Sequence, residues 1–137
     1  MKIITTNSLD DNAIFIRQKV FVEEQGFFDE FDDNDKKATH FIAFDDNGNA
    51  VGTCRVFKCD DGYMFGRLAV LKEYRKNKIG SHLMSEVEKF VLKNNGKFIK
   101  LHSQIRAVEF YKKVGYTPYG EIEPEEGYPH IWMKKML

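Results

Sequence analysis

The chain has 137 residues, of which 42% are hydrophobic and 14% aromatic, enough apolar material for the core of one globular domain. Lys plus Arg and Asp plus Glu each number 21, so the net charge is zero, which argues against non-specific nucleic-acid binding. No apolar run approaches the roughly 20 residues of a membrane-spanning helix, and the N-terminus lacks a signal peptide's apolar stretch. We therefore expect one cytoplasmic domain over residues 1–137, with no nucleic-acid or membrane partner.

The first half of the chain predicts a strand, a helix and an antiparallel meander. Lys2 to Thr6 has the composition of a strand, and Ser8 is a candidate N-cap for the helix that follows. The apolar stripe of this helix recurs every three or four residues, and Gly26 can end it. Phe27 to Lys37 is acidic and aromatic, which fits a loop or a second short helix. Strands are expected at 39–44, 50–58 and 63–71, separated by turns rich in Asp, Asn and Gly.

The second half predicts a parallel crossover. Apolar residues from Ile79 to Val91 have helical spacing, and a strand at 98–102 follows, so the strand–helix–strand order implies a parallel pair. We expect a short helix over Gln104 to Lys113 and last strands at 116–119 and 131–136, with an acidic stretch between them. The sequence thus predicts an α/β (α+β) domain with a mixed, mostly antiparallel sheet of six to seven strands, a central parallel pair and about four helices.

Charge is balanced in total but divided along the chain. Residues 1–66 hold seven Lys or Arg against 13 Asp or Glu, whereas residues 67–137 hold 14 against eight. The acidic excess is densest from Glu23 to Asp35, and the basic excess lies between Lys72 and Lys113. Taken singly, each charged side chain is explained as part of the solvent-exposed surface. Together, the two regions suggest that one half holds a polyanion while the other attracts a cation.

The junction between the strand at 63–71 and the next helix carries the strongest chemical signal. A basic loop with Arg75, Lys76 and Lys78 leads directly into the helix. The first turn of a helix has unpaired N–H groups and a positive dipole end, which suit phosphate oxygens. Gly80 allows close approach of backbone to a ligand, and Ser81 adds a hydroxyl. The segment predicts a phosphate site, with a solvated basic turn as the alternative.

This junction resembles the acetyl-CoA-binding motif of the GNAT N-acetyltransferase superfamily, in which Arg or Gln is followed by x-x-Gly-x-Gly or Ala. Arg75 and Gly80 match the motif, while Lys78 stands at its first glycine. The segment from Gln104 to Tyr116 is similar to a second family signature, Asn-x-x-Ala-x-x-Phe-Tyr-x-x-x-Gly-Phe. Gln104 replaces its Asn, and Tyr111 coincides with the tyrosine often assigned as general acid.

Two further stretches are similar to the ElaA-like, or YjcF-like, branch of this superfamily. One is Val20 to Gln25 followed by Asp35, Ala38 and His40, and the other is Gly127 to Met133. The resemblance implies a GNAT-like fold, acetyl-CoA as co-substrate and no metal. It also implies the following set of acetyl-CoA contacts: Leu68, Ala69, Val70, Arg75, Lys76, Asn77, Lys78, Ile79, Gly80, Ser81, Gln104 and Tyr111. Within this set, a backbone N–H of residues 68–70 is implied to donate to the thioester oxygen.

Acetyl transfer to an amine needs a base, an oxyanion donor and an acid for the leaving thiolate. Tyr111 is the expected acid. Glu24 and His130 are the first candidates for the base because they lie in the branch-like stretches, and His40, His102 or a water relay are alternatives. Cys54 is expected to be a small core residue, with a position facing the acetyl-CoA thiol as the alternative. Its odd separation from Cys59 predicts that the two thiols do not pair.

The resemblance implies transfer of an acetyl group from acetyl-CoA to a primary amine of a small molecule or peptide, by direct attack in a ternary complex. The alternative is a non-catalytic acyl-CoA-binding or sensing module. If the acidic segment from Glu23 to Asp35 borders the acceptor site, it attracts a cationic amine. Phe27, Phe28 and Phe31 can cover the pocket or form a dimer contact, so both a monomer and a homodimer are open.

Overall fold

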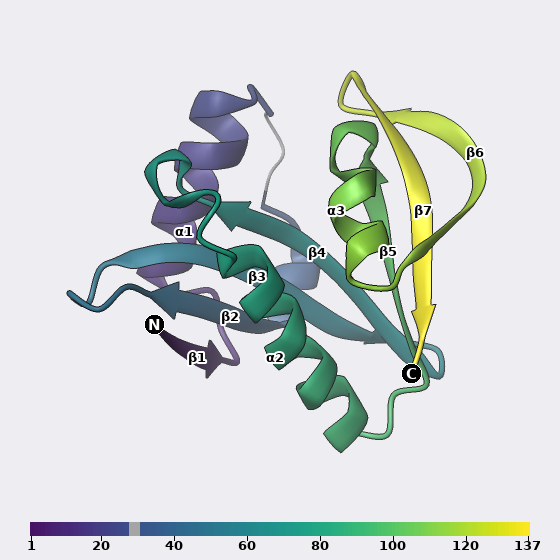
Figure 1. Cartoon of the computed structure of the whole chain (residues 1–137), viewed down its shortest axis with the longest axis horizontal. Helices are drawn as coiled ribbons and strands as arrows, with labels where there is room; N and C mark the ends of the chain where they lie inside the picture. Colours follow the sequence, from purple (N-terminus) through teal and green to yellow (C-terminus); the bar gives the residue numbers. More distant parts are fainter. Residues whose placement is uncertain (28–30) are drawn as a thin grey trace.

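The computed structural model describes residues 1–27 and 31–137, and these form one seven-stranded mixed sheet (Figure 1). The strands lie in the order β1-β2-β3-β4-β5-β7-β6, in which β4 and β5 are parallel and every other neighbouring pair is antiparallel. The predicted mixed sheet with a central parallel pair is confirmed. The strand bounds are β1 Lys2–Thr6, β2 Thr39–Phe44, β3 Ala50–Cys59, β4 Gly62–Val70, β5 Phe98–Gln104, β6 Thr117–Glu125 and β7 Tyr128–Met136.

Three α-helices are found in the described residues, slightly fewer than the expected four. They are α1 (Asp11–Arg17), α2 (Ile79–Lys93) and α3 (Val108–Lys113). In Figure 1, α2 and α3 lie on one face of the sheet and α1 lies on the other. α1 continues as a π-helical segment, η1 (Gln18–Glu24). The remaining helical turns are short 3-10 segments: η2 (Asp33–Lys36), η3 (Lys72–Tyr74) and η4 (Ile105–Ala107).

Local side-chain chemistry explains where the first helix begins and ends. Asp10, rather than the predicted Ser8, is the N-cap of α1, because its carboxylate accepts a hydrogen bond from the Ala13 amide at 3.1 Å. Gly26 follows η1 with a φ of +79°, so it ends the helix as predicted. The stretch after it contains the short helix η2, one of the two structures that the sequence left open.

Three boundaries in the C-terminal third differ from the prediction. Gln104 belongs to β5 and not to a helix, and α3 begins only at Val108, after η4. β6 and β7 are both longer than expected and form a hairpin, so the acidic stretch 121–126 lies in β6 and its turn. Glu126 and Gly127 have φ angles of +49° and +83°, as in the tight two-residue turns that suit the twist of a hairpin.

The main core lies between the sheet and the apolar face of α2. Leu83, Met84 and Val87 of α2 are at most 1% exposed and belong to one buried cluster with residues of β2 to β5 and β7. Burial of each such side chain stabilises the fold by about 2 kcal/mol. Cys54 of β3 is in this cluster, as predicted, and burial raises the pKa of its thiol. Cys54 and Cys59 are both free, which confirms that they do not pair.

β4 and β5 pair only at their beginnings and then diverge. The paired residues are Tyr63 with Ile99 and Met64 with Lys100, so residues 65–70 of β4 have no strand partner on this side within the described residues. On the other side, β3 contributes the single residue Cys54 opposite Arg67 and Leu68, which makes a β-bulge. Arg67 has a φ of +55° there. The sheet therefore opens between β4 and β5, as Figure 1 shows.

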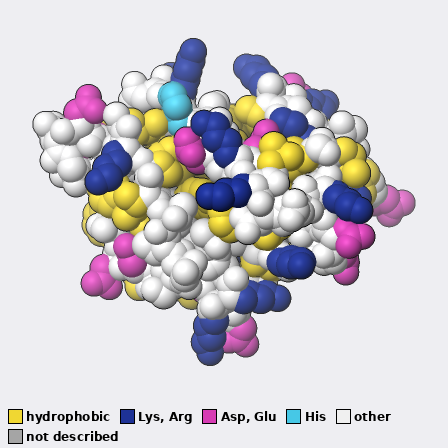
Figure 2. Space-filling model, turned by 90° about the horizontal axis from the view of Figure 1, so that it is seen from below, with side chains coloured by type: hydrophobic (Ala, Val, Ile, Leu, Met, Phe, Trp, Pro, Cys, Tyr) yellow, Lys and Arg dark blue, Asp and Glu magenta, His cyan; other side chains and the backbone are white. Residues whose placement is uncertain are grey.

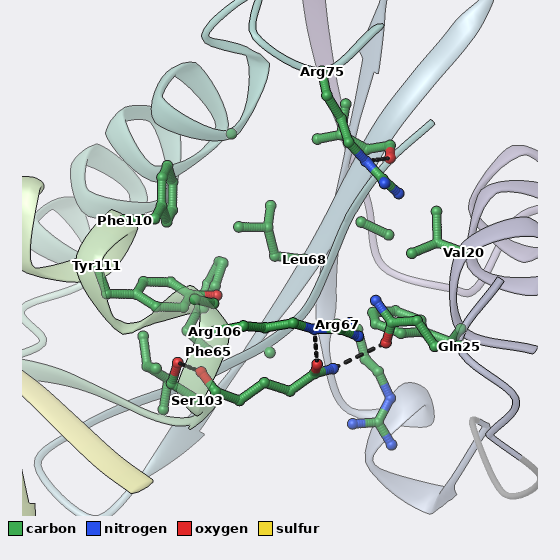
Figure 3. Close-up of a pocket in the computed structure, with 18 of the residues that line it drawn as sticks. Val20, Gln25, Phe65, Arg67, Leu68, Arg75, Ser103, Arg106, Phe110 and Tyr111 are labelled. Atoms are coloured by element: carbon green, nitrogen blue, oxygen red, sulfur yellow. Dashed lines mark hydrogen bonds between the residues drawn. The ribbon is translucent and has the colours of Figure 1, made fainter. Parts of the chain in front are cut away.

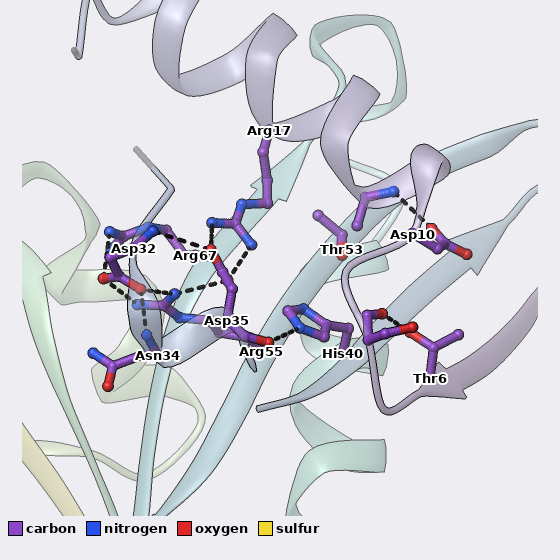
Figure 4. A network of polar contacts seen from close by, with 12 residues as sticks. Thr6, Asp10, Arg17, Asp32, Asn34, Asp35, His40, Thr53, Arg55 and Arg67 are labelled. Atoms are coloured by element: carbon purple, nitrogen blue, oxygen red, sulfur yellow. Dashed lines mark hydrogen bonds and ion pairs between the residues drawn. The ribbon is translucent and has the colours of Figure 1, made fainter. Parts of the chain in front are cut away.

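A buried ion network holds the segment after residue 30 against the sheet (Figure 4). Asp35 accepts hydrogen bonds from Arg17 at 2.8 and 3.0 Å and from Arg55 at 2.8 Å, and all three residues are at least 95% buried. Asp32 accepts from Arg55 at 2.6 Å and from Arg67 at 3.3 Å. These two carboxylates of the predicted acidic segment are thus neutralised by Arg side chains. Asp29 and Glu30, which belong to the same prediction, lie outside the described residues.

The surface seen in Figure 2 has positive and negative side chains interspersed, without a field of one sign. The division of charge along the sequence is therefore not a division of that face. Within residues 1–27 and 31–137, no helix is long and apolar enough to cross a lipid bilayer.

Candidate active site

The opening between β4 and β5 is a cleft of about 750 Å³. Its walls come from β4, β5, the start of α2, α3, the end of η1 and the β6–β7 turn (Figure 3). Segments that are far apart in sequence therefore meet at one site. The predicted site residues that line it are Leu68, Ala69, Val70, Arg75, Lys76, Lys78, Ile79, Gly80, Ser81, Gln104, Tyr111 and His130. Four other candidates do not line it: Glu24, Asn77, His40 and Cys54.

The β4 wall offers backbone groups that the sheet does not use. The bulge at Arg67 and Leu68 interrupts the ladder with β3, and the divergence from β5 removes the partner on the other edge. Backbone N–H and C=O groups form hydrogen bonds almost without exception when they are buried, so this edge of residues 65–70 is suited to a strand-like ligand.

The start of α2 forms a second wall with free amide groups. Lys78 is the residue before the helix and has a φ of +60°, which a glycine adopts at lower cost. No described side chain caps the first turn, so the amides of residues 79–81 keep their hydrogen-bonding capacity. At Gly80 a Cβ atom would lie 3.2 Å from the Phe110 ring and 3.9 Å from Leu68, so glycine lets the start of α2 pack closely against two cleft residues.

Arg75 and Glu24 form an ion pair at the edge of the cleft. Two guanidinium nitrogens donate to the carboxylate at 2.6 and 2.7 Å, and the Nε of Arg75 donates to the Val70 carbonyl at 3.0 Å. The hydrogen bond from Arg75 holds the pKa of Glu24 below its usual range. This pairing fastens η1 to the loop before α2 and makes Glu24 a weaker proton acceptor.

Tyr111 places a phenol in the cleft from the other side. The residue is 8% exposed and packs edge-to-face against Phe65, Phe110 and Tyr116. Its hydroxyl points into the cleft in Figure 3. Burial raises the pKa of Tyr111, so the phenol keeps its proton at neutral pH. Phe110 is only partly buried, packs against the main core and also lines the cleft.

Two of the three candidate histidines reach the cleft, and one does not. His130 of β7 is 3% exposed and its Nδ1 lies 2.8 Å from the Tyr128 carbonyl oxygen. His102 of β5 also lines the cleft, where its ring lies tilted against that of His130 with a centroid distance of 4.9 Å. His40 instead donates through Nε2 to the Asp35 carbonyl at 3.0 Å, within the buried ion network.

A bridge of polar side chains joins the end of β5 to the segment after η1. Gln104 donates to Gln25 at 2.9 Å and accepts from Arg106 at 2.7 Å (Figure 3). The Tyr128 hydroxyl donates to the Gln25 carbonyl at 2.6 Å, and the Phe27 ring packs on Tyr128 at 5.1 Å. Phe27 thus covers part of the cleft, which was one of its two predicted roles. Phe28 lies outside the described residues.

Sequence reasoning missed several residues that line the cleft. Gln25, Phe65, Ser103, Arg106 and Glu125 belong to this set. The sequence does carry a signal for Glu125 as a cleft residue, because Glu126-Gly127 between two strand-like runs is typical of a tight turn. Such a turn places the carboxylates that precede it beside His130 on the next strand. No group of three or more His, Cys, Asp or Glu side chains in the described part of the chain has the geometry to hold a metal ion.

Comparison with known proteins identifies the class to which this fold and cleft belong. Residues 7–137 match the family model described as an acetyltransferase (GNAT) domain. The chain is 34% identical over 128 residues to the N-acetyltransferase YjcF of Bacillus subtilis, covering 90% of each protein. It is 31% identical over 127 residues to protein ElaA of Escherichia coli, covering 88% of this chain and 82% of ElaA.

Solved structures agree with this assignment. The crystal structure of Escherichia coli ElaA aligns with a TM-score of 0.88 at 25% identity, over 98% of this chain and 99% of that one. An aminoglycoside 6'-N-acetyltransferase solved with coenzyme A shares the fold, with a TM-score of 0.76 at 20% identity over 99% and 97% of the two chains. The chain is an acetyltransferase with acetyl-CoA as its co-substrate. It belongs to the GNAT family, which confirms the predicted recognition and the ElaA/YjcF-like relationship.

Proposed function

We propose that residues 1–137 form one N-acetyltransferase domain that transfers an acetyl group from acetyl-CoA to a primary amine of a small molecule or peptide. The amine attacks the thioester directly while both substrates are bound. The observation that carries this proposal is that one cleft is lined by the start of α2 with its free amides, by Tyr111 and by His130. The acetyl donor, the general acid and the general base can therefore act at one reaction centre.

The donor half of the proposal rests on the backbone of two elements. Residues 68–70 have no partner in β5 and, apart from the Val70 carbonyl that accepts from Arg75, this edge is suited to the extended, amide-containing arm of acetyl-CoA. The amides of residues 76–81 are suited to its pyrophosphate. Lys76 and Lys78 add positive charge beside those amides. Because the Arg75 guanidinium is paired with Glu24, its proposed role is to hold this loop in place.

The chemistry proposed for the chain has three parts. A backbone N–H of residues 68–70 stabilises negative charge on the thioester oxygen. His130 accepts a proton from the amine through Nε2 as the C–N bond forms. Tyr111 donates its phenolic proton to sulfur as the C–S bond breaks and sulfur takes the bonding electrons. Proton exchange with solvent restores both side chains, so a neutral amine and acetyl-CoA give an N-acetyl amine and coenzyme A, and an amine that starts as its ammonium ion releases one further proton.

Geometry favours His130 as the base over the other candidates. A carbonyl oxygen can only accept, so the Nδ1 of His130 carries the proton that it shares with Tyr128, and Nε2 keeps a lone pair. Glu24 is held by Arg75 and does not line the cleft, and His40 is buried in the ion network. His102 lines the cleft, but its Nδ1 is engaged by Glu125 at 2.9 Å.

A screen of acceptors tests the proposal. Release of free thiol from acetyl-CoA is followed across polyamines, aminoglycosides, amino acids and peptides, with each product checked by mass spectrometry for one added acetyl group. We expect turnover with at least one class of primary amine and a loss of about 100-fold or more in His130→Gln. The proposal fails if coenzyme A binds but no amine is acetylated, or if His130→Gln retains full activity.

A further inference from the structure

Glu125 lies between the two histidines at the end of the cleft. One carboxylate oxygen is 2.9 Å from the Nδ1 of His102, and the other is 3.7 Å from the Nε2 of His130. The three residues come from the adjacent strands β5, β6 and β7. Glu125 is half exposed, with 49% of its side chain accessible, whereas the His130 side chain is only 4% accessible. A charge on a buried imidazole is costly unless a partner of opposite charge lies nearby, and Glu125 provides such a partner.

The position of this carboxylate is fixed by His102. The His102 ring stacks on Trp132 at a centroid distance of 4.6 Å and lies against the His130 ring at 4.9 Å. Its Nδ1 faces one oxygen of Glu125, so the N–H donates and the carboxylate cannot rotate away freely. The second oxygen of Glu125 consequently stays on the Nε2 side of His130.

We propose that Glu125 and His102 are positioning residues for His130 in the acetyl transfer, an inference that rests on the proposed function. His130 enters the reaction with a lone pair on Nε2, because Nδ1–H is committed to the Tyr128 carbonyl. When Nε2 accepts the proton of the attacking amine, the resulting imidazolium gains a negative charge 3.7 Å away. Glu125 stabilises this charged state without itself taking the proton, which later leaves to solvent.

Other charged side chains also lie near the two histidines. Glu123 of β6 lies 3.3 Å from the Nε2 of His102, and Glu126 lies in the turn. Arg106 of η4 reaches the cleft over the Tyr128 ring, and Arg67 lines it from β4. Glu125 approaches the Nε2 of His130 to 3.7 Å. The inference therefore concerns Glu125 specifically.

The test compares Glu125→Gln with Glu121→Gln, which removes the same charge from the same exposed strand without a histidine contact. Acetylation of spermidine and of a lysine-containing peptide is measured against pH at saturating acetyl-CoA. We expect Glu125→Gln to lower kcat by about tenfold and to move the acid limb of the rate profile to lower pH. The KM for acetyl-CoA, obtained by varying acetyl-CoA at one pH, stays unchanged, and Glu121→Gln behaves as the parent protein.

Two further measurements separate positioning from a general structural effect. With hydroxylamine, whose nitrogen loses its proton more readily after attack than that of an alkylamine and so needs less help from a base, the loss in Glu125→Gln shrinks after the uncatalysed reaction is subtracted. In a double-mutant cycle, His102→Gln combined with Glu125→Gln loses no more activity than Glu125→Gln alone, because His102 acts through Glu125. The inference is wrong if Glu125→Gln leaves kcat and the pH profile unchanged. It is also wrong if Glu125→Gln loses as much activity with hydroxylamine as with spermidine and the losses of His102→Gln and Glu125→Gln add in the double variant.

The inference and the proposed function fail in different ways. If the parent protein acetylates neither spermidine nor the peptide while it binds coenzyme A, the proposed function is refuted for these amines and the broader acceptor screen decides it. If the parent protein is active and His130→Gln is not, but Glu125→Gln has full activity, only the positioning role is refuted.

Discussion

Replacing Asp35 by Asn should destabilise the protein by an amount that depends on pH. Asp35 is the centre of the buried ion network and receives hydrogen bonds from Arg17 and Arg55 (Figure 4). Burial by itself raises the pKa of a carboxyl group, but the hydrogen bonds from the two Arg side chains outweigh it. The pKa of Asp35 falls from its ordinary value of 3.8 to about 2.

This lowered pKa translates into stability. One pKa unit corresponds to about 1.4 kcal/mol, so the charged form of Asp35 contributes about 2.5 kcal/mol to the free energy of unfolding at neutral pH. Because the folded-state pKa lies below the unfolded-state value, this contribution is complete above a pH of about 4. It is lost as the pH falls through about 2. Asp35→Asn removes the charge at every pH and should cost that amount at neutral pH.

Urea denaturation monitored by far-ultraviolet circular dichroism measures this cost, from neutral pH down to about pH 3. Asp33→Asn is the matched control, because Asp33 lies on the same short helix and its side chain is fully accessible. We expect Asp33→Asn to leave the unfolding free energy unchanged. A difference between the parent protein and Asp35→Asn that is negligible at neutral pH, or that does not shrink on acidification, refutes the reasoning.

Three further changes test the cleft. Tyr111→Phe should lower kcat by about 100-fold while coenzyme A still binds, since only the proton donor is removed; equal turnover contradicts this. Lys78→Gly should raise the melting temperature, because glycine adopts the φ of +60° at a cost lower by about 1 kcal/mol. In calorimetry, the same variant should bind coenzyme A only several-fold more weakly than the parent protein. Gly80→Val should abolish measurable coenzyme A binding, because its side chain projects toward Phe110 and Leu68, whereas a folded variant that binds normally contradicts the proposed site.

Local patterns explain why most of the fold was predictable. The alternation and turns of residues 39–71 predicted β2, β3 and β4 to within one or two residues, since their register follows from side chains that must face one core. The strand–helix–strand order predicted the parallel pair of β4 and β5. The motif around Gly80 predicted that this segment would line a ligand site, because a helix N-terminus has the same free amides in every fold.

The parts that failed depend on contacts between distant segments. Nothing local indicates that Asp35 meets Arg17 and Arg55, so the acidic segment was interpreted as free negative charge. Likewise, no local pattern indicates that Glu24 pairs with Arg75, 51 residues away. The length of the β6–β7 hairpin was underestimated because its acidic residues have low strand propensity, yet they occupy an edge strand where charge is favourable.

The account depends most on acetyl-CoA lying between β4 and β5 with its pyrophosphate at the start of α2. Backbone amide chemical shifts followed by NMR during addition of coenzyme A test this directly. We predict that the largest changes occur at the amides of residues 76–81 and 68–70, all of which except Asn77 line the cleft. Saturating changes confined to other segments, or no changes at all, would contradict it.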